Sequence, residues 1–318
     1  QGTISLNNSG VLTLADPEGP ADTGTVNIRT TAAGGNFQQT NASRVDVAAD
    51  FSIAGTTSFQ SPIRLIGNVA AALAGDATFQ STIDSPGTAW NLVLGGNGAK
   101  TFQDAIGSSD PIGTLTVNGT TGLVHFQSTV EAGSASQTNN ANPIRFDGNV
   151  TLSGGPSSFL GDLTLDGLVF SSTGDVTLGT APADGDSITL SGSDVTLQGN
   201  GAYTVYSSIS GAQNLILAGG SQATSTGSKT FHGAIGSPIP LLSITQADTS
   251  GPVTFAAYVT TGDLTTLANA SFGPGTLTAS GTVQIGSNPP GDDTATLVGA
   301  TTWTGNAVYT IYAPLNGN

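Results

Sequence analysis

The stretch Asn91-Leu92-Val93-Leu94-Gly95-Gly96 decides the fold, because the chain repeats it as Asn214-Leu215-Ile216-Leu217-Ala218-Gly219. Further matches follow in the same order, and they pair Lys100-Thr101-Phe102 with Lys229-Thr230-Phe231, Leu115-Thr116-Val117 with Leu242-Ser243-Ile244, and Val124-His125-Phe126 with Val253-Thr254-Phe255. The two copies keep their short apolar segments and differ in the lengths between them. A repeat of this kind indicates an array architecture.

Triplets in which a polar residue separates two apolar ones recur along the whole chain. Examples are Leu12-Thr13-Leu14, Ile63-Arg64-Leu65, Leu163-Thr164-Leu165 and Val283-Gln284-Ile285. Alternation with period two predicts short, half-buried strands, and the Gly, Asn, Asp, Ser and Pro between them predict tight turns. No stretch of ten residues has helical periodicity, so we expect an all-β chain.

Two architectures fit this pattern. One is a right-handed parallel β-solenoid with coils of roughly 20–30 residues stacked about 4.8 Å apart. The other is a row of β-sandwich modules of about 100 residues each, which requires longer strands and linkers between modules. The triplets are short and no Pro-rich or charged linker occurs. The sequence therefore favours residues 1–318 as a single continuous solenoid, built of degenerate repeats of roughly a hundred residues.

The faces of the strands follow from the alternation. In a stacked coil the outer two residues of each triplet face the core and the middle one faces solvent. The middle residues are mostly Thr, Ser, Asn and Gln, which predicts a neutral outer surface. The residues that we expect to be buried in the two copies are Leu94, Leu115, Val117, Phe126, Leu217, Ile244 and Phe255.

Composition excludes several classes of function. The 318 residues contain 6 Lys+Arg against 21 Asp+Glu, a formal net charge of -15. Nucleic-acid binding and docking on anionic lipid both need clustered cations, and no apolar run is long enough for membrane insertion. The chain has no Cys, little charge and 45 Gly, a composition that suits an exported, extracellular protein.

Segments such as Asn91 to Gly98 and Gly113-Thr114-Leu115-Thr116-Val117-Asn118-Gly119 resemble the β-strand repeats of large exported bacterial surface proteins. The best-known relatives are filamentous-haemagglutinin-like adhesins and autotransporter passenger domains. The resemblance covers nearly the whole chain. It implies a right-handed β-helix, export, and a role on the cell surface as an adhesin or in a matrix, and it transfers no functional residue.

Catalytic chemistry is not favoured. His125 and His232 are replaced by Thr254 and Gln103 in the other copy, which indicates surface variation instead of a general base. Asp147, Asp162, Asp166 and Asp175 lie beside glycines, where structural Asx turns are common, and the mixed pair of Arg145 with Asp147 is the one arrangement that suggests a glycan-cleaving site.

Calcium is the one cofactor that the sequence suggests, because acidic loops next to Gly supply the oxygen ligands that hard cations need. The strict β-roll spacing is missing, so solvated turn acids are the competing interpretation. The candidate ligands are Asp16, Glu18, Asp22, Asp184, Asp186, Asp292 and Asp293.

The two lysines and the two tryptophans are interpreted as structural residues. Lys100 and Lys229 are the only lysines and occupy the same repeat position. We expect them to extend toward solvent from a strand start, the alternative being an isopeptide bond to an Asn. Trp90 and Trp303 are isolated, so we expect core or turn-covering roles and no sugar platform.

Neither end of the sequence has an atypical polar capping segment. Tyr309 to Asn318 matches Tyr203 to Ala212, the lead-in to a further copy of the repeat. A solenoid exposes unpaired backbone groups at each end, so we expect flanking repeats of a longer chain or another copy of the protein to continue the sheet. The residues expected at these assembly ends are Thr3, Ile4, Leu6, Leu12, Leu14, Trp303, Tyr309, Ile311 and Leu315.

These observations predict a nonenzymatic, structural protein that contributes to a surface fibre, matrix or adhesin by end-to-end β-stacking. The alternative is a β-helix module that binds glycan through its Thr- and Asn-rich face. Ice binding and polysaccharide cleavage are further alternatives, of which the first requires regular Thr-x-Thr rows and the second requires grouped carboxylates.

Overall fold

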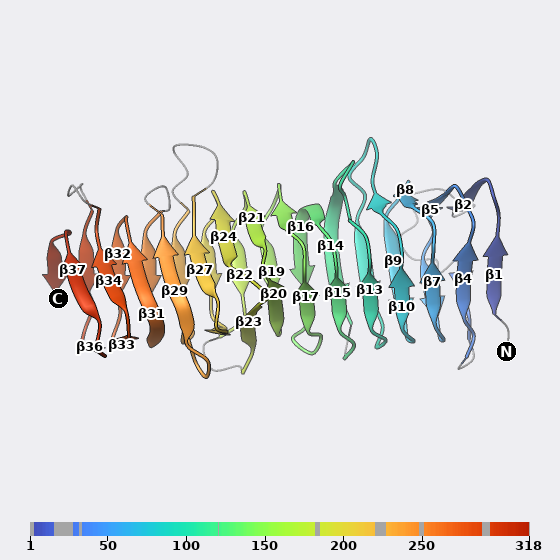
Figure 1. Cartoon of the computed structure of the whole chain (residues 1–318). Helices are drawn as coiled ribbons and strands as arrows, with labels where there is room; N and C mark the ends of the chain where they lie inside the picture. The colour runs from blue at the N-terminus through green and yellow to red at the C-terminus, as the bar shows by residue number, and fades with distance from the viewer. Residues whose placement is uncertain are drawn as a thin grey trace. The chain divides into compact units, whose positions relative to one another are not determined.

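The computed structural model describes residues 3–15, 28–31, 34–119, 121–181, 185–219, 227–247, 251–287 and 293–317. They form an all-β parallel β-solenoid (Figure 1). The chain divides into two compact units, Gln1–Gly154 (unit 1) and Gly155–Asn318 (unit 2). The pairings between described strands are parallel, so the solenoid is confirmed and antiparallel sandwich modules are excluded. In this described part of the chain no helix is long and apolar enough to cross a membrane.

Unit 1 consists of three parallel sheets, which the chain visits in turn within each coil. The first contains β1 (Ile4–Asn7), β4 (Phe37–Thr40), β7 (Thr57–Phe59), β10 (Ala77–Phe79), β13 (Lys100–Phe102), β15 (Val124–Phe126) and β17 (Ile144–Phe146). The second contains β2 (Val11–Ala15), β5 (Arg44–Ala48), β8 (Ile63–Leu65), β11 (Ile83–Asp84) and β18 (Val150–Leu152). Isolated bridges at Ile106 connect Ile83 of β11 with Val130, which pairs with Val150 of β18. The third contains β3 (Ile28–Arg29), β6 (Phe51–Ile53), β9 (Val69–Leu73), β12 (Leu92–Gly95), β14 (Ile112–Asn118) and β16 (Val130–Gln137), whose start also pairs with β18.

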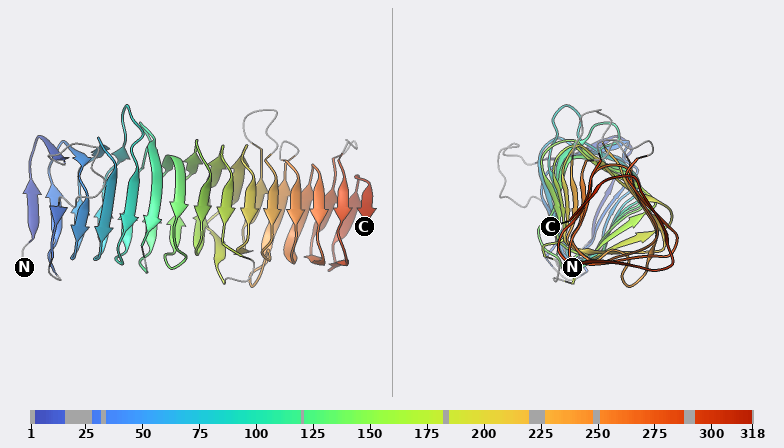
Figure 2. Two further views of the ribbon diagram at one scale, coloured as in Figure 1. Left: turned by 180° about the vertical axis from the view of Figure 1, so that it is seen from behind. Right: turned by 90° about the vertical axis from the view of Figure 1, so that its left-hand side faces the viewer.

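Unit 2 is built in the same way, and its final coil is a triangle when viewed end on (Figure 2). Its first sheet contains β20 (Leu163–Asp166), β23 (Ser187–Ser191), β26 (Ser208–Ser210), the start of β31 (Val259–Thr266), β33 (Gly275–Ala279) and β36 (Thr301–Thr304). The second contains β21 (Val169–Ser172), β24 (Val195–Gly199), β27 (Asn214–Leu217), β29 (Leu241–Gln246), the end of β31, β34 (Thr282–Ile285) and β37 (Val308–Ile311). The third contains β19 (Ser157–Phe159), β22 (Val176–Leu178), β25 (Tyr203–Val205), β28 (Lys229–Phe231), β30 (Val253–Phe255), β32 (Ala270–Phe272), β35 (Ala295–Leu297) and β38 (Leu315–Gly317).

The strand register accounts for the sequence repeat. In the first copy Leu92 of β12 pairs with Leu115, and in the second copy Leu215 pairs with Ile244. Likewise Lys100 pairs with Val124, and Lys229 pairs with Val253. The pairing at the two lysines is therefore the same, but Ile244 and not Leu242 takes the position of Leu115, and Leu242 is 55% exposed, so the predicted match of these two segments is wrong by two residues. Most register partners lie within the expected coil length of roughly 20–30 residues.

The predicted faces are also confirmed. Triplets such as Val124-His125-Phe126 bury their outer residues and leave the middle one half-exposed, and all seven residues named above as core are buried. In unit 1 the core contains a column of phenylalanine rings on successive coils, with centroids 4.6–5.5 Å apart. The column comprises Phe59, Phe79, Phe102, Phe126 and Phe146.

The Asp and Asn side chains at the corners form hydrogen bonds between coils, which differ from the local turns that the sequence predicts. Local Asx turns were expected at Asp162 and Asp175, but each carboxylate accepts a hydrogen bond from a backbone N–H of the following coil, at Ser187 (2.9 Å) and Ala202 (2.9 Å). The same contact recurs in both units. Other acceptor and donor pairs are Asn36 with Thr56, Asp50 with Ala70, Asn68 with Asn91, Asp76 with Ala99, Asn91 with Thr114, and Asn269 with Thr294. These side chains tie neighbouring coils together instead of closing their own turns.

Candidate functional site

The acidic loops give no support for a metal site in the described residues. Five of the calcium candidates, Asp16, Glu18, Asp22, Asp184 and Asp292, lie outside the described part of the chain, so the structure does not test them. Asp186 is half-buried, and Asp293 accepts hydrogen bonds from the backbone N–H and the hydroxyl of Ser287. No group of three or more His, Asp and Glu side chains that could hold a metal ion occurs among the residues described.

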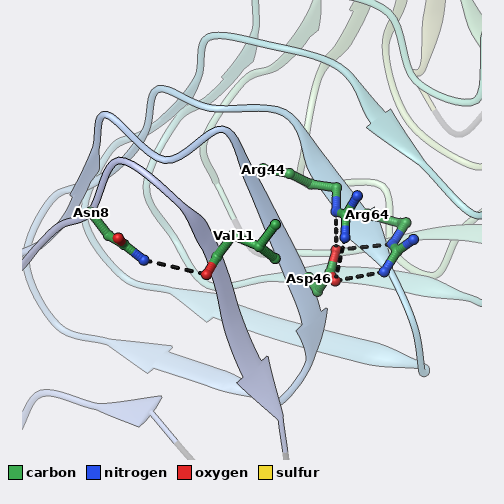
Figure 3. Close-up of polar contacts among 5 residues, drawn as sticks. All are labelled: Asn8, Val11, Arg44, Asp46 and Arg64. Atoms are coloured by element: carbon green, nitrogen blue, oxygen red, sulfur yellow. Dashed lines mark hydrogen bonds and ion pairs between the residues drawn. The ribbon is translucent and has the colours of Figure 1, made fainter.

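One carboxylate on the outer face of unit 1 is held by two arginines. Asp46 on β5 accepts paired hydrogen bonds from Arg44 (2.7 and 3.1 Å) and from Arg64 on β8 (2.9 and 2.6 Å) (Figure 3). Burial alone would raise the pKa of Asp46, but the hydrogen bonds and charges of the two guanidinium groups outweigh it and hold the pKa below its usual value. All carboxylate oxygens are occupied, which identifies a structural ion cluster.

Replacing Asp46→Asn is expected to lower the free energy of unfolding by about 2 kcal/mol, because two guanidinium groups lose their shared anion. The stabilisation by the ionised Asp46 carboxylate is present at neutral pH, and it is lost as the pH falls below about 4 and through the depressed pKa of Asp46 in the folded protein. Urea unfolding at pH 7 measures the effect. Asp104→Asn is the matched control, because among the described residues Asp104 bonds only to the adjacent backbone N–H of Ala105; equal losses in the two variants would refute the assignment.

A second ion cluster contains one of the two histidines. The expected pair of Arg145 and Asp147 is confirmed at 2.6 Å, and His125 Nε2 lies 2.7 Å from the other carboxylate oxygen. Burial acts to raise the pKa of Asp147, but the hydrogen bonds from His125 and Arg145 lower it overall. Sequence reasoning missed His125, which the register places beside Arg145. In the described part of the chain no hydroxyl hydrogen-bonds to His125.

The lysine prediction is wrong, because both side chains point into the core. Lys100 is 1% exposed and Lys229 is 0% exposed. Lys100 Nζ donates to the carbonyls of Gly96 and Gly98, both at 2.8 Å. Gly96 adopts φ +85°, and a side chain there would collide with the backbone of Leu73, so glycine is what lets this corner turn its carbonyl toward the ammonium group.

Lys229 occupies the equivalent corner with weaker contacts. Its Nζ lies 3.5 Å from the carbonyl of Gly227 and 5.6 Å from the ring centroid of Tyr203 in the preceding coil. Burial lowers the pKa of each lysine to about 8, and it raises the pKa of Tyr203. Neither lysine forms an ion pair with a described carboxylate.

The C-terminal coil of unit 2 combines several of the residues expected at an assembly end. In the described part of the chain, β36, β37 and β38 each pair on one side only, with β33, β34 and β35. Ile311 is 37% exposed, whereas its register partner Ile285 is 1% exposed; Leu315 is 47% exposed, whereas its partner Ala295 is fully buried. Trp303 and Tyr309 are half-buried and stack on each other with ring centroids 5.6 Å apart.

Tyr309 repeats an interior contact of the same unit. Its hydroxyl donates to the carbonyl of Thr304, five residues earlier, and the Tyr203 hydroxyl donates to that of Gln198, also five residues earlier. The two tyrosines therefore share a local contact, although Tyr203 lies in the third sheet of the unit and Tyr309 in the second. Tyr203 is covered by the next coil and is fully buried, whereas no described coil covers Tyr309.

The first coil of unit 1 has a similarly incomplete core. Thr3 is exposed, and Ile4, Leu6, Leu12 and Leu14 are half-buried. Their register partners in the next coil include Phe37, Val45 and Val47, which are at most 2% exposed. β1 and β2 each pair on one side, with β4 and β5, among the described strands.

The other tryptophan lies at a turn. Trp90 is half-buried, and its backbone N–H donates to the hydroxyl of Ser85.

Comparison with known proteins finds no matching family model, no similar curated protein and no similar solved structure.

Proposed function

We propose that the chain is a structural component of an exported, extracellular assembly, extended by end-to-end β-stacking between copies. In this proposal β36–β38 of one copy pair with the first coil, β1–β3, of the next. The proposal assigns no catalytic step. It agrees with the low charge and the absence of Cys, and with the resemblance of the repeats to bacterial surface proteins.

The observation that carries the proposal is the outer edge of β36–β38, with which no described strand pairs; flanking repeats of a longer chain are the alternative partner for this edge. Natural proteins block exposed strand edges with charged residues, proline or bulges. The strands have the sequences TTWT, VYTI and LNG, with no charge and no proline. The edge residues Val308, Ile311 and Leu315 are exposed, so pairing with a further coil would bury apolar surface as well as backbone groups.

The first coil offers the complementary edge. β1 and β2 have the sequences ISLN and VLTLA, again without a charged residue. Their core-facing residues Ile4, Leu6, Leu12 and Leu14 are only half-buried. A heterologous contact between two different ends of identical copies produces an open filament instead of a closed dimer.

Light scattering and electron microscopy of the purified chain test the proposal. We expect filaments at micromolar concentration and a monomer for the double variant Ile311→Lys/Leu315→Lys, because charges on the edge oppose pairing. Deleting residues 1–14 should abolish filaments and leave the fold intact. Leu242→Lys is the control, since Leu242 is exposed on β29, a strand paired on both sides. A full chain that stays monomeric at millimolar concentration contradicts the proposal, and so do filaments formed equally by all variants.

A further inference from the structure

An open groove of about 250 Å³ lies on the outer face of β30, β32 and β35 in unit 2. Its floor is formed by the middle residues of these strands, Thr254, Ser271 and Thr296, which the strand register places next to one another. A second row contributes Pro252, Asn269 and Thr294. Every side chain that lines the groove is neutral.

Hydroxyl groups continue beyond the groove along the same sheet. The register extends the row from Thr254 back through Thr230, Thr204 and Thr177, one residue on each strand. Coils in a parallel sheet are about 4.8 Å apart, so the face presents donors and acceptors at a constant spacing. The carboxamide oxygen of Asn269 accepts hydrogen bonds from the N–H and hydroxyl of Thr294, which fixes its orientation.

An aromatic stack lies next to this row. Tyr206 and His232 follow Thr204 and Thr230 by two residues, and their rings stack with centroids 4.9 Å apart and planes 14° apart. The backbone N–H of His232 donates to the carbonyl of Val205, and the backbone N–H of Ala256 donates to the carbonyl of Phe231. Ala256 therefore takes the position next to His232 on the following coil. The side chain of Ala256 is a methyl group, so the face of the His232 imidazole that points toward this coil has no aromatic partner in the part of the chain that the structure describes.

We infer that this face binds a neutral polysaccharide, with one sugar ring seated over Ala256 and stacked on His232. Its hydroxyl groups would bond to Thr254, Ser271 and Asn269 along the groove. An apolar ring face beside a few convergent polar groups is the usual composition of a small-ligand site. Polyuronates are disfavoured, because the groove offers no cation and the chain has a net charge of -15. This inference does not rest on end-to-end assembly.

The experiment is affinity electrophoresis of the full chain, carrying Ile311→Lys/Leu315→Lys so that it migrates as a monomer, through native gels that contain dextran, laminarin, xyloglucan, mannan or polygalacturonate. We expect at least one neutral polysaccharide to retard the protein. His232→Ala should weaken that binding about tenfold by removing the stacking surface, and Ser271→Val should weaken it by removing a hydroxyl from the floor.

Two control variants carry the same chemical changes in unit 1. His125→Ala removes a histidine that is paired with Asp147 on the outer face, and Ser136→Val removes an outward hydroxyl on β16; both should leave retardation unchanged. Circular dichroism verifies that each variant is folded. Migration unaffected by every neutral polysaccharide, retardation by polygalacturonate alone, or equal losses in the unit 1 variants would each overturn the inference.

Discussion

Truncation of Phe126→Ala will destabilise unit 1 by about 3–5 kcal/mol, the cost of deleting a large side chain from a core that cannot collapse around the gap. Phe126 stacks between Phe102 (4.9 Å) and Phe146 (5.0 Å) and is 1% exposed. The strands on either side hold the neighbouring rings in fixed register, so the cavity stays open. Urea unfolding and amide hydrogen exchange in β13, β15 and β17 measure the loss.

Thr116→Ala is the control for the core assignment. Thr116 is the middle residue of its triplet on β14 and lies half-exposed on the outer face. Its replacement should change the free energy of unfolding by about 0.5 kcal/mol or less. Similar losses for Phe126→Ala and Thr116→Ala would mean that the inner and outer faces have been exchanged.

Raising the pH from 7 to 9.5 will increase stability, because two lysines are buried with a pKa of about 8. An unfolded lysine titrates near 10.4, so above pH 8 the unfolded chain holds more protons than the folded one. The free energy of unfolding therefore rises with pH in this window. Measurements should stop near pH 9.5, because the raised pKa of buried Tyr203 reverses the slope once unfolded tyrosines ionise.

The two lysines form a matched pair for substitution by methionine. Lys229→Met should increase stability at pH 7 by about 2–3 kcal/mol, since it removes a buried charge that has one 3.5 Å carbonyl contact. Lys100→Met should increase stability less, because it leaves the carbonyls of Gly96 and Gly98 without the hydrogen bonds that the ammonium group donates at 2.8 Å. Urea unfolding at pH 7 and 9.5 compares them. A loss of stability in Lys229→Met, or a larger gain in Lys100→Met, would contradict this account.

Much of the fold is predictable from the sequence, because the period of the strands and the spacing of their triplets are local properties. Alternation in Val124-His125-Phe126 identifies which residues are buried, and the repeat identifies which strands have the same environment. The phenylalanine column is also visible in retrospect. Phe59, Phe79, Phe102, Phe126 and Phe146 follow one another at intervals of 20, 23, 24 and 20 residues, which is one coil each.

The misplaced residues depend on contacts between coils. Lys100 begins a strand and resembles a solvent-facing residue, yet its burial depends on carbonyls that the Gly96–Gly98 corner turns inward. His125 differs from its counterpart Thr254, and its carboxylate partner lies 22 residues away on the next coil. The neutral groove likewise requires the register of three strands. Such contacts become predictable once the coil length at each position is known, and the loops vary that length.

The corner Asx contacts give the solenoid a polarity. In each of them the acceptor side chain lies on the earlier coil and the N–H donor lies on the later one, as with Asn36 and Thr56 in unit 1 or Asp175 and Ala202 in unit 2. A coil that docks onto its predecessor therefore meets acceptors already in place, whereas one that docks onto its successor must still order its own side chains. Templating accordingly favours one direction of growth, from lower to higher residue number, which is the order in which a ribosome releases the polypeptide.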